Sequence, residues 1–269
     1  MHALADTDPV AADRLLQGLV DHNLLLEPVA GRYEMHDLIR AHARTLAEHD
    51  PADERQSALE RLLDYYQHTG LRADAQSVPP GPAPRHAPAL AGDGSARTWL
   101  RAERANLVAC LGYAIDVGLA ERIVALSAGL ANLLRTEGPW PTGINVQAAA
   151  ANAAARLGDP SGRARALTEL GNLQGLTDDY PGAKASLRAA LELYRETSDR
   201  VGEAHALIRL GAVQNMSGDC LSAEANLQAA LKLHRETGNK TGEAHALIQL
   251  IQVQRLTGKY EDAVRNRHL

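Results

Sequence analysis

The C-terminal half of the chain repeats its pattern of apolar and polar positions every forty residues. Segments 163–202 and 203–242 share 18 of 40 residues when they are aligned without a gap. A third copy begins at residue 243 with EAHALI, the same six residues that open the second copy. Self-similarity at a fixed period of this size predicts stacked supersecondary units, each of which buries its apolar face against its neighbours.

Each forty-residue copy predicts a pair of helices separated by a turn. Apolar and small residues recur with helical spacing, the pattern breaks at 177–179 or 217–219, and it then resumes. The pattern consists of Leu167, Leu170, Gly171, Gln174, Ala183, Leu187, Ala190, Leu191 and Tyr194 in the first copy, and of Leu207, Leu210, Gly211, Gln214, Ala223, Leu227, Ala230, Leu231 and His234 in the second. Glycine inside a helix costs about 1 kcal/mol relative to alanine. Its presence at the same place in both copies therefore predicts close helix contact there.

This pattern resembles the tetratricopeptide repeat. The small residue in the first helix stands where that family has one, as does the spacing of alanine, large apolar residue and alanine in the second helix. The period exceeds the family's usual 34 residues by about six. The resemblance implies a mainly α fold, an α–α superhelix over residues 97–269, with a groove that binds a protein or peptide ligand.

Weaker copies of the pattern extend upstream of the clear repeats. Segments 119–134 and 144–157 together predict one degenerate repeat, and 97–117 predicts an amphipathic helix that caps the stack. The expected buried stripe of this cap is Trp99, Leu100, Leu107, Leu111 and Ile115. Downstream, the match thins after Gln254 and Arg267 stands where a buried leucine is expected, which predicts an array truncated at its C-terminus.

Residues 1–50 have a different pattern. Helical spacing over 13–23 and 36–48 encloses two short strands, 24–28 and 32–35, which predicts the back half of a winged helix. Winged helices often bind DNA, but this segment has four Arg and no Lys against nine Asp and Glu, a formal charge of 4 − 9 = −5. Because phosphate binding requires a basic face, we expect no direct nucleic acid binding from this chain.

Two segments separate these regions. Residues 51–71 predict a connecting helix. Residues 72–96 contain five prolines and almost no large apolar side chains, which is typical of an extended linker. A proline-rich recognition peptide is the alternative interpretation of this segment.

The segment LVDHNLLLEPVAGRYEMHDLIRAHART resembles the winged helix that closes the nucleotide-binding module of the STAND class of signalling ATPases, called NB-ARC. The family's hallmark is Met-His-Asp, here Met35, His36 and Asp37. The resemblance implies that His36 contacts the phosphate of bound ADP and that Asp37 supports the local geometry. An imidazole can donate to a phosphate oxygen, which suits a histidine to this role.

The nucleotide module itself is not encoded in these residues. No GxxxxGK[ST] is present, and no strand is followed by acidic residues suited to Mg²⁺. We therefore expect no cofactor in this chain. The resemblance implies ADP or ATP only for a full-length parent whose NB-ARC core lies upstream.

The winged segment, the linker and TWLRAERANLVA before the repeats together resemble the C-terminal half of AfsR-like regulators along nearly the whole chain. Those regulators have a DNA-binding and activation region, an NB-ARC module and then tetratricopeptide repeats. The resemblance implies the sensor part of a transcriptional regulator. The first alternative is a stand-alone peptide-sensing repeat regulator without a nucleotide module, and the second is a DNA-binding protein that uses the winged segment.

The sequence offers no set of residues for catalysis or metal binding. No Ser/His/Asp or Cys/His set stands out, and His205 and His245 lie one period apart because the repeat copies them. Cys110 and Cys220 have no metal-ligand spacing and are expected to be free thiols. No apolar run approaches the roughly 18 residues of a membrane span and no signal peptide opens the chain, which indicates a cytoplasmic protein without a membrane partner.

The candidate groove residues are polar side chains of the first helices that lie off the packing stripe. They are Asn172, Arg209, Asn215 and Gln249. We expect these residues to contact a protein or peptide ligand.

The repeat register predicts the outcome of two substitutions. Leu210→Asp should unfold the array because it places a charge between hairpins, whereas His205→Ala should change stability little. Thermal unfolding followed by circular dichroism measures both. Equal losses would show that the buried positions are assigned wrongly.

Overall fold

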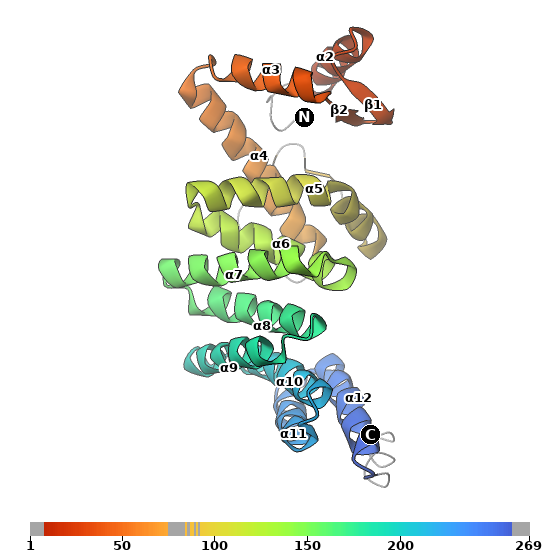
Figure 1. Cartoon of the computed structure of the whole chain (residues 1–269), viewed down its shortest axis with the longest axis vertical. Coiled ribbons are helices and arrows are strands. Elements are labelled where there is room, and N and C mark those ends of the chain that lie inside the picture. Colours follow the sequence, from red (N-terminus) through yellow and green to blue (C-terminus); the bar gives the residue numbers. More distant parts are fainter. Residues whose placement is uncertain (1–7, 75–83, 85–86, 89, 91, 260–269) are drawn as a thin grey trace.

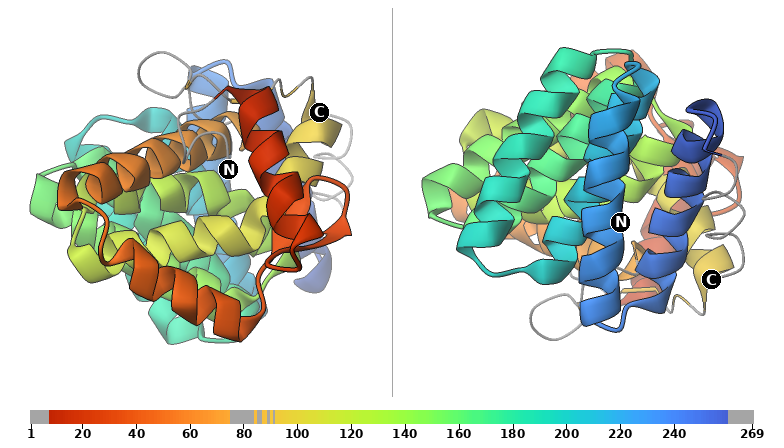
Figure 2. Two further views of the ribbon diagram at one scale, coloured as in Figure 1. Left: turned by 90° about the horizontal axis from the view of Figure 1, so that it is seen from above. Right: turned by 90° about the horizontal axis from the view of Figure 1, so that it is seen from below.

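The computed structural model describes residues 8–74, 84, 87–88, 90 and 92–259. Its helices stack along the long axis of the molecule, with a small α/β unit at one end and α12 at the other (Figure 1). Views along the long axis show the helices of the stack lying across it, layer after layer (Figure 2). The predicted truncation at residues 265–269 and most of the predicted linker lie outside the described residues.

The N-terminal unit consists of α2 (Pro9–Asp21), β1 (Leu26–Val29), β2 (Arg32–Glu34) and α3 (Asp37–Ala47). The two strands pair antiparallel, in the predicted order of helix, hairpin and helix. Helix α2 begins four residues before the predicted start. The Asp8 side chain caps it by accepting from the Ala11 amide, and proline occupies the first turn, where its missing N–H costs nothing.

This unit has a small core. Among its described apolar residues, only Ala12, Leu16 and Leu25 are buried. Every residue of α3 is exposed or half-buried. Its exposed large apolar side chains are Val10, Leu15, Leu24, Leu26, Val29, Leu38 and Leu46. In this unit the exposed large apolar side chains therefore outnumber the buried apolar residues.

The rest of the described chain is a stack of helices. They are α4 (Ala52–Ala73), α5 (Asp93–Val117), α6 (Ala120–Glu137), α7 (Trp140–Leu157), α8 (Pro160–Leu176), α9 (Tyr180–Glu196), α10 (Arg200–Met216), α11 (Cys220–Glu236) and α12 (Lys240–Leu256). Helices α8 and α9 form the first predicted hairpin, and α10 and α11 form the second. The prediction of a mainly α, tetratricopeptide-type superhelix is confirmed.

Helix caps explain why the hairpins have their boundaries. Each of α8 to α12 follows an Asp or Asn whose side chain accepts from the backbone N–H three residues later, at 2.8 to 3.2 Å. The residue before each cap has a positive φ, which ends the preceding helix. These caps are Asp159, Asp179, Asp199, Asp219 and Asn239. The same two residues, one with a positive φ and one capping Asp or Asn, therefore form each turn that precedes α8 to α12.

Close helix contact at Gly171 and Gly211 is confirmed. A Cβ on Gly171 would lie 2.6 Å from Leu187 Cγ, and a Cβ on Gly211 would lie 2.8 Å from Leu227 Cγ. Both leucines are fully buried in one continuous core that joins the repeats. The glycines thus allow the second helix of each hairpin to pack tightly on the first.

The structure places α4 inside the stack. The sequence pattern predicts a connecting helix, but α4 packs on both α5 and α6, and its Leu63 and Tyr66 belong to the same core as Leu107 of α5. The forty-residue period does not extend upstream through the long helix α5. The repeat pattern therefore gives no signal for this arrangement.

The predicted burial is wrong for one residue of the expected stripe in α5. Leu100, Leu107 and Leu111 are buried and Trp99 is half-buried, but Ile115 is 40% exposed. Ile115 stands in the last turn of α5, three residues before Gly118 ends the helix in a left-handed conformation. The thiols follow expectation, since Cys110 is buried, Cys220 is half-buried and both are free.

The glycine contacts generate a test in which one substitution has opposite effects at two sites. Gly211→Ala should destabilise the fold by about 1–3 kcal/mol, because the added methyl group overlaps Leu227 in a packed core. Gly112→Ala in α5 should stabilise it by about 0.5–1 kcal/mol, because no atom lies within 4 Å of the new Cβ. Urea unfolding measures both. A neutral or stabilising Gly211→Ala would contradict the packing described here.

Candidate binding groove

The even-numbered helices form the inner face of the stack. Each of α4, α6, α8, α10 and α12 contacts the next one, whereas no comparable contact joins successive odd-numbered helices in the described residues. Successive even-numbered helices are in contact, so they lie closer together than successive odd-numbered helices do. The stack therefore curves toward the even-numbered helices, and this side is its concave face.

A cleft of about 320 Å³ opens on this face between α6, α8 and α10. Its wall includes small apolar side chains such as Ala128 and Ala131. Its polar and charged lining includes Asp74, Ser127, Arg165, Thr168, Glu169 and His205. The cleft thus combines an apolar wall with several charged groups, as ligand sites commonly do.

Alternating charges cross the inner helices beside this cleft. Arg135 Nε of α6 lies 3.6 Å from Glu169 Oε2 of α8. Arg209 of α10 is half-buried, and burial lowers the pKa of its guanidinium while Glu169 opposes that shift. The Glu169 carboxylate of α8 therefore interacts electrostatically with arginines of both neighbouring inner helices.

The structure places the four predicted groove residues at separate points. Arg209 and Gln249 occupy the same position in successive inner helices, and both are half-buried. Asn215 is half-buried near the turn, where its Oδ1 accepts from Cys220 Sγ at 3.7 Å. Asn172 is also half-buried. None of these four residues lines the cleft between α6, α8 and α10.

Two charged residues of this face were missed by sequence reasoning. Glu169 occupies the repeat position of Arg209 and Gln249, so the forty-residue register contained the signal for it. Asp74 carried no such signal, because it falls in the segment predicted as a linker. In the structure it ends α4 and is buried.

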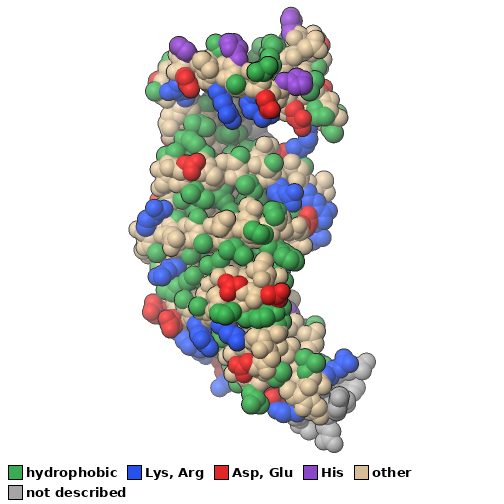
Figure 3. Space-filling model, in the orientation of Figure 1, with side chains coloured by type: hydrophobic (Ala, Val, Ile, Leu, Met, Phe, Trp, Pro, Cys, Tyr) green, Lys and Arg blue, Asp and Glu red, His purple; other side chains and the backbone are tan. Residues whose placement is uncertain are grey.

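The Met-His-Asp motif lies on the exposed N-terminal unit. His36 is the residue before α3, its side chain makes no capping bond, and it is exposed. Asp37 Oδ1 pairs with Arg40 Nη1 at 3.1 Å, and Arg40 also donates to the Met35 carbonyl at 3.0 Å. Arg40 therefore contacts the residues on both sides of His36, through the Met35 carbonyl and the Asp37 side chain. Figure 3 shows several histidine side chains gathered at this end of the molecule.

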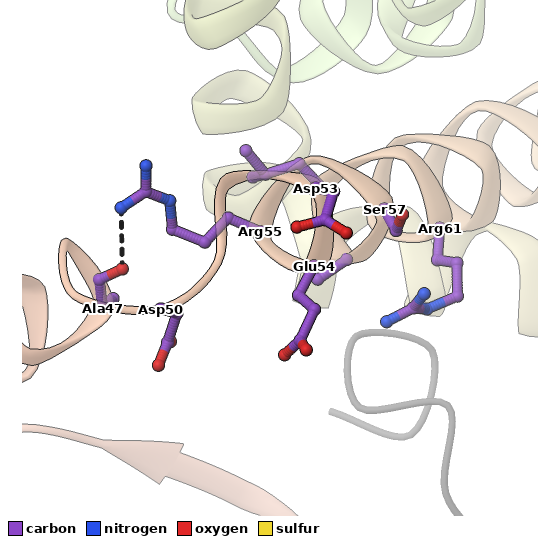
Figure 4. Close-up of a pocket in the computed structure, with 9 residues that line it drawn as sticks. Ala47, Asp50, Asp53, Glu54, Arg55, Ser57 and Arg61 are labelled. Carbon is purple, nitrogen blue, oxygen red and sulfur yellow. Dashed lines mark hydrogen bonds between the residues drawn. The ribbon is translucent and has the colours of Figure 1, made fainter.

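A second cleft, of about 600 Å³, lies where α3 meets α4 (Figure 4). Arg55 donates to the carbonyls of Ala47 at 3.0 Å and Glu48 at 2.7 Å, which ties the end of α3 to α4. Asp50, Asp53 and Glu54 line the same cleft. With Arg55 and Arg61, the lining has three carboxylates against two arginines, and this acidic balance is unsuited to a nucleotide phosphate.

An ion pair links the N-terminal unit to the stack. Arg32 Nη2 of β2 lies 2.7 Å from Glu103 Oε1 of α5, and the Tyr66 hydroxyl of α4 donates to Glu103 Oε2 at 2.8 Å. Burial raises the pKa of Glu103, but hydrogen bonds from Asn106 and Tyr66 and the charge of Arg32 outweigh it and hold the pKa below its usual range. Glu103 is therefore ionised and joins three elements.

Histidines of three successive helices meet near the C-terminal repeats. The rings of His205 and His234 lie 5.6 Å apart edge to face, and His234 is fully buried with no hydrogen-bond partner on either nitrogen. Burial, followed by the charges of His205 and His245, lowers the pKa of His234. Among the described residues no group of His, Cys, Asp or Glu is arranged to hold a metal ion.

The fold and its concave inner face define a tetratricopeptide-type repeat protein. The chain is 34% identical over 202 residues to the regulatory protein AfsR of Streptomyces griseus, covering 72% of this chain and 21% of that protein. It is 37% identical over 136 residues to AfsR of Streptomyces coelicolor, covering 46% of this chain and 14% of that protein. No model of a known protein family matches the chain.

Solved structures of other proteins share the fold. A Rap protein in complex with competence and sporulation factor superposes with a TM-score of 0.51 at 14% identity, covering 94% of this chain and 68% of that one. BtubC from P. vanneervenii gives 0.53 at 16% identity, covering 81% and 92%. At these identities the likeness shows the fold alone.

The predicted resemblance to AfsR-like regulators is thus confirmed over most of the chain. The matched part spans about a fifth or less of those relatives' lengths. Both relatives are regulatory proteins. In the described part of the chain, no helix is long and apolar enough to cross a membrane.

The buried His234 generates a prediction about pH. Its folded-state pKa is lower than its unfolded value, so the unfolded state binds more protons and stability is lost as the pH falls below the unfolded value of about 6.5. His234→Tyr, which installs the residue found one repeat earlier at Tyr194, should reduce this loss. Unfolding free energies between pH 7.5 and 5 measure it. An unchanged slope would show that His234 does not titrate in this way.

Proposed function

We propose that this chain is a non-catalytic repeat scaffold that binds a protein or peptide segment, and that it is the sensor part of an AfsR-like STAND transcriptional regulator. The observation that carries the proposal is the match to two AfsR proteins over a chain whose described helices curve around one inner face. The proposed ligand lies along this face and contacts Asn172, Arg209, Asn215 and Gln249.

The inner face supports ligand binding in three ways. It is concave, it carries a cleft with an apolar wall, and it presents half-buried charges on successive helices. Half-buried charges are only partly hydrated, so these charges lose less hydration free energy when a complementary ligand group binds them. A protein of the same fold, Rap, is seen in complex with competence and sporulation factor, which supports a similar use here.

The N-terminal unit supports a nucleotide-binding parent. Its exposed apolar side chains on α2 and α3 offer a surface for an upstream NB-ARC core. His36 is exposed at the start of α3, where it would donate to a phosphate of ADP bound by that core. Asp37 and Arg40 would hold its backbone in place through the contact to the Met35 carbonyl.

In this proposal the groove and the nucleotide site are coupled. A ligand that binds the inner face better in one of two conformations shifts the population between the closed ADP state and an open state. Helix α4 and the contact between Arg32 and Glu103 are the described connections through which such a shift would reach the N-terminal unit. The protein would act in the cytoplasm, and the parent's separate N-terminal region would contact DNA.

The alternative, a stand-alone peptide-sensing regulator, shares the groove but not the nucleotide module. The genomic sequence upstream of the Met1 codon separates the two. An in-frame segment that encodes GxxxxGK[ST] supports the proposed parent, and its absence supports the alternative.

Ligand binding itself is tested with an array of hexapeptides of random composition. We expect the purified chain to bind a subset of peptides, and Arg209→Glu to weaken that binding by roughly tenfold or more through loss of a half-buried charge. Lys232→Glu is the matched control, because its side chain is 78% exposed on α11 of the outer row. No peptide binding, or equal losses from both variants, would contradict a ligand on the inner face.

A further inference from the structure

We propose that the cleft between α6, α8 and α10 is a subsite for a positively charged side chain, an arginine or lysine of the bound segment. The inference rests on the proposed function, and it adds the chemistry that one position of the ligand must have. The juxtaposition that carries it is Asp74 at the end of α4, a buried carboxylate with one oxygen that lacks a hydrogen-bond partner, together with Glu169 of α8 in the same cleft.

Asp74 is the central observation. Its side chain lines the cleft, the residue is only 7% exposed, and Oδ1 has no hydrogen-bond partner. Leaving one oxygen of a buried carboxylate without a partner is costly, since nearly all buried polar groups in proteins are paired. A ligand cation would supply the missing partner.

The position of Asp74 on its helix adds to this preference. Asp74 is the C-cap of α4, and its backbone N–H donates to the Gly70 carbonyl at 3.0 Å. The C-terminal end of a helix carries a partial negative charge, which disfavours a carboxylate and favours a cation. The helix end and the side chain therefore attract the same kind of ligand group.

The side chains that line the cleft carry a net negative charge, while Arg135, outside the lining, attracts both Asp74 and Glu169. The cleft contains three carboxylates, Asp74, Glu169 and Asp199, against Arg165, a formal charge of 1 − 3 = −2 with His205 neutral. Asp199 already accepts from the Gly202 amide at 2.8 Å, and Arg165 is exposed. Asp74 Oδ1 is therefore the carboxylate oxygen left to receive a cation, and Glu169, which Arg135 and Arg209 also attract, lies in the same cleft.

Glu169 itself is only loosely engaged. The 3.6 Å between its Oε2 and Arg135 Nε is an ion pair without a hydrogen bond. Asp74 also lines a third cleft, which lies between α4, α5 and α6 and contains Arg97 and Arg101. Arg101 is held there by Glu137 at 2.6 Å, and within the described residues neither arginine pairs with Asp74.

The wall of the cleft suits the stem of a long cationic side chain. Val124, Ala128, Ala131 and Ala166 line it alongside the charged groups. Arginine and lysine pack their methylene groups on apolar surface while their charged ends reach polar groups. A small inorganic cation would leave this wall uncovered.

Proton linkage supports the same reading. Burial and the charge of Glu169 raise the pKa of Asp74 to about 7, opposed by Arg135 and the backbone of Asn132. A bound cation favours the ionised carboxylate and lowers that pKa, so binding should release a proton. Affinity for a cationic ligand should therefore increase as the pH rises from 6 to 8.

The experiment uses the purified chain and two hexapeptide arrays that differ only at one position, arginine in one and its neutral isostere citrulline in the other. We expect the arginine set to bind roughly tenfold more tightly, as for a charge-assisted hydrogen bond. Asp74→Asn should remove this preference and its dependence on pH. Glu192→Gln, on an exposed carboxylate of α9 outside the cleft, should preserve both.

The outcomes separate the two proposals. If neither array binds, the groove proposal fails and the subsite fails with it. If both arrays bind equally, or if Asp74→Asn retains the preference for arginine, the subsite is wrong and the groove proposal stands. If Asp74→Asn does not fold, Glu169→Gln decides, because full retention of the preference in that variant would also overturn the subsite.

Discussion

The packing of each hairpin on the next is the interaction on which the rest of the structure depends. One helical hairpin has an apolar face that it cannot bury alone, and the chain solves this by repeating the same face forty residues later. Leu187 and Leu227 are fully buried at equivalent places, and Gly171 and Gly211 let the paired helices approach them. The inner face, its cleft and its charges exist because this contact recurs in a fixed direction.

The sequence predicts most of this architecture because the same pattern of helix, turn and packing residues occurs in two aligned copies. Helix spacing, the small residue at Gly171 and the capping residue at Asp179 agree in both copies, so hairpins and turns are correctly placed. Where only one copy exists, prediction is weaker. Ile115 fits the helical stripe of α5 but stands in its last turn, where the structure leaves it exposed.

The candidate site is less predictable than the fold, because it depends on which elements meet. Arg209 and Gln249 were chosen from the repeat register, and the same register includes Glu169, which the structure adds to the cleft. Asp74 is different. Its place on the inner face follows from the packing of α4 on α6, a contact that local composition cannot encode and that the proline-rich stretch after it obscures.

Contacts between immediate neighbours alone also have a mechanical consequence. Besides the outer helices that flank it, each inner helix of the described stack contacts mainly the inner helix before it and the inner helix after it, so contacts between distant repeats do not hold the stack in one shape. The pitch of such a superhelix is the sum of many small rotations between neighbouring repeats. Small changes in these rotations add up, so the superhelix deforms easily along its length. A segment bound across α6, α8 and α10 would fix several of those rotations at once. Because α4 packs on α6 and leads to the N-terminal unit, the changed pitch would displace that unit.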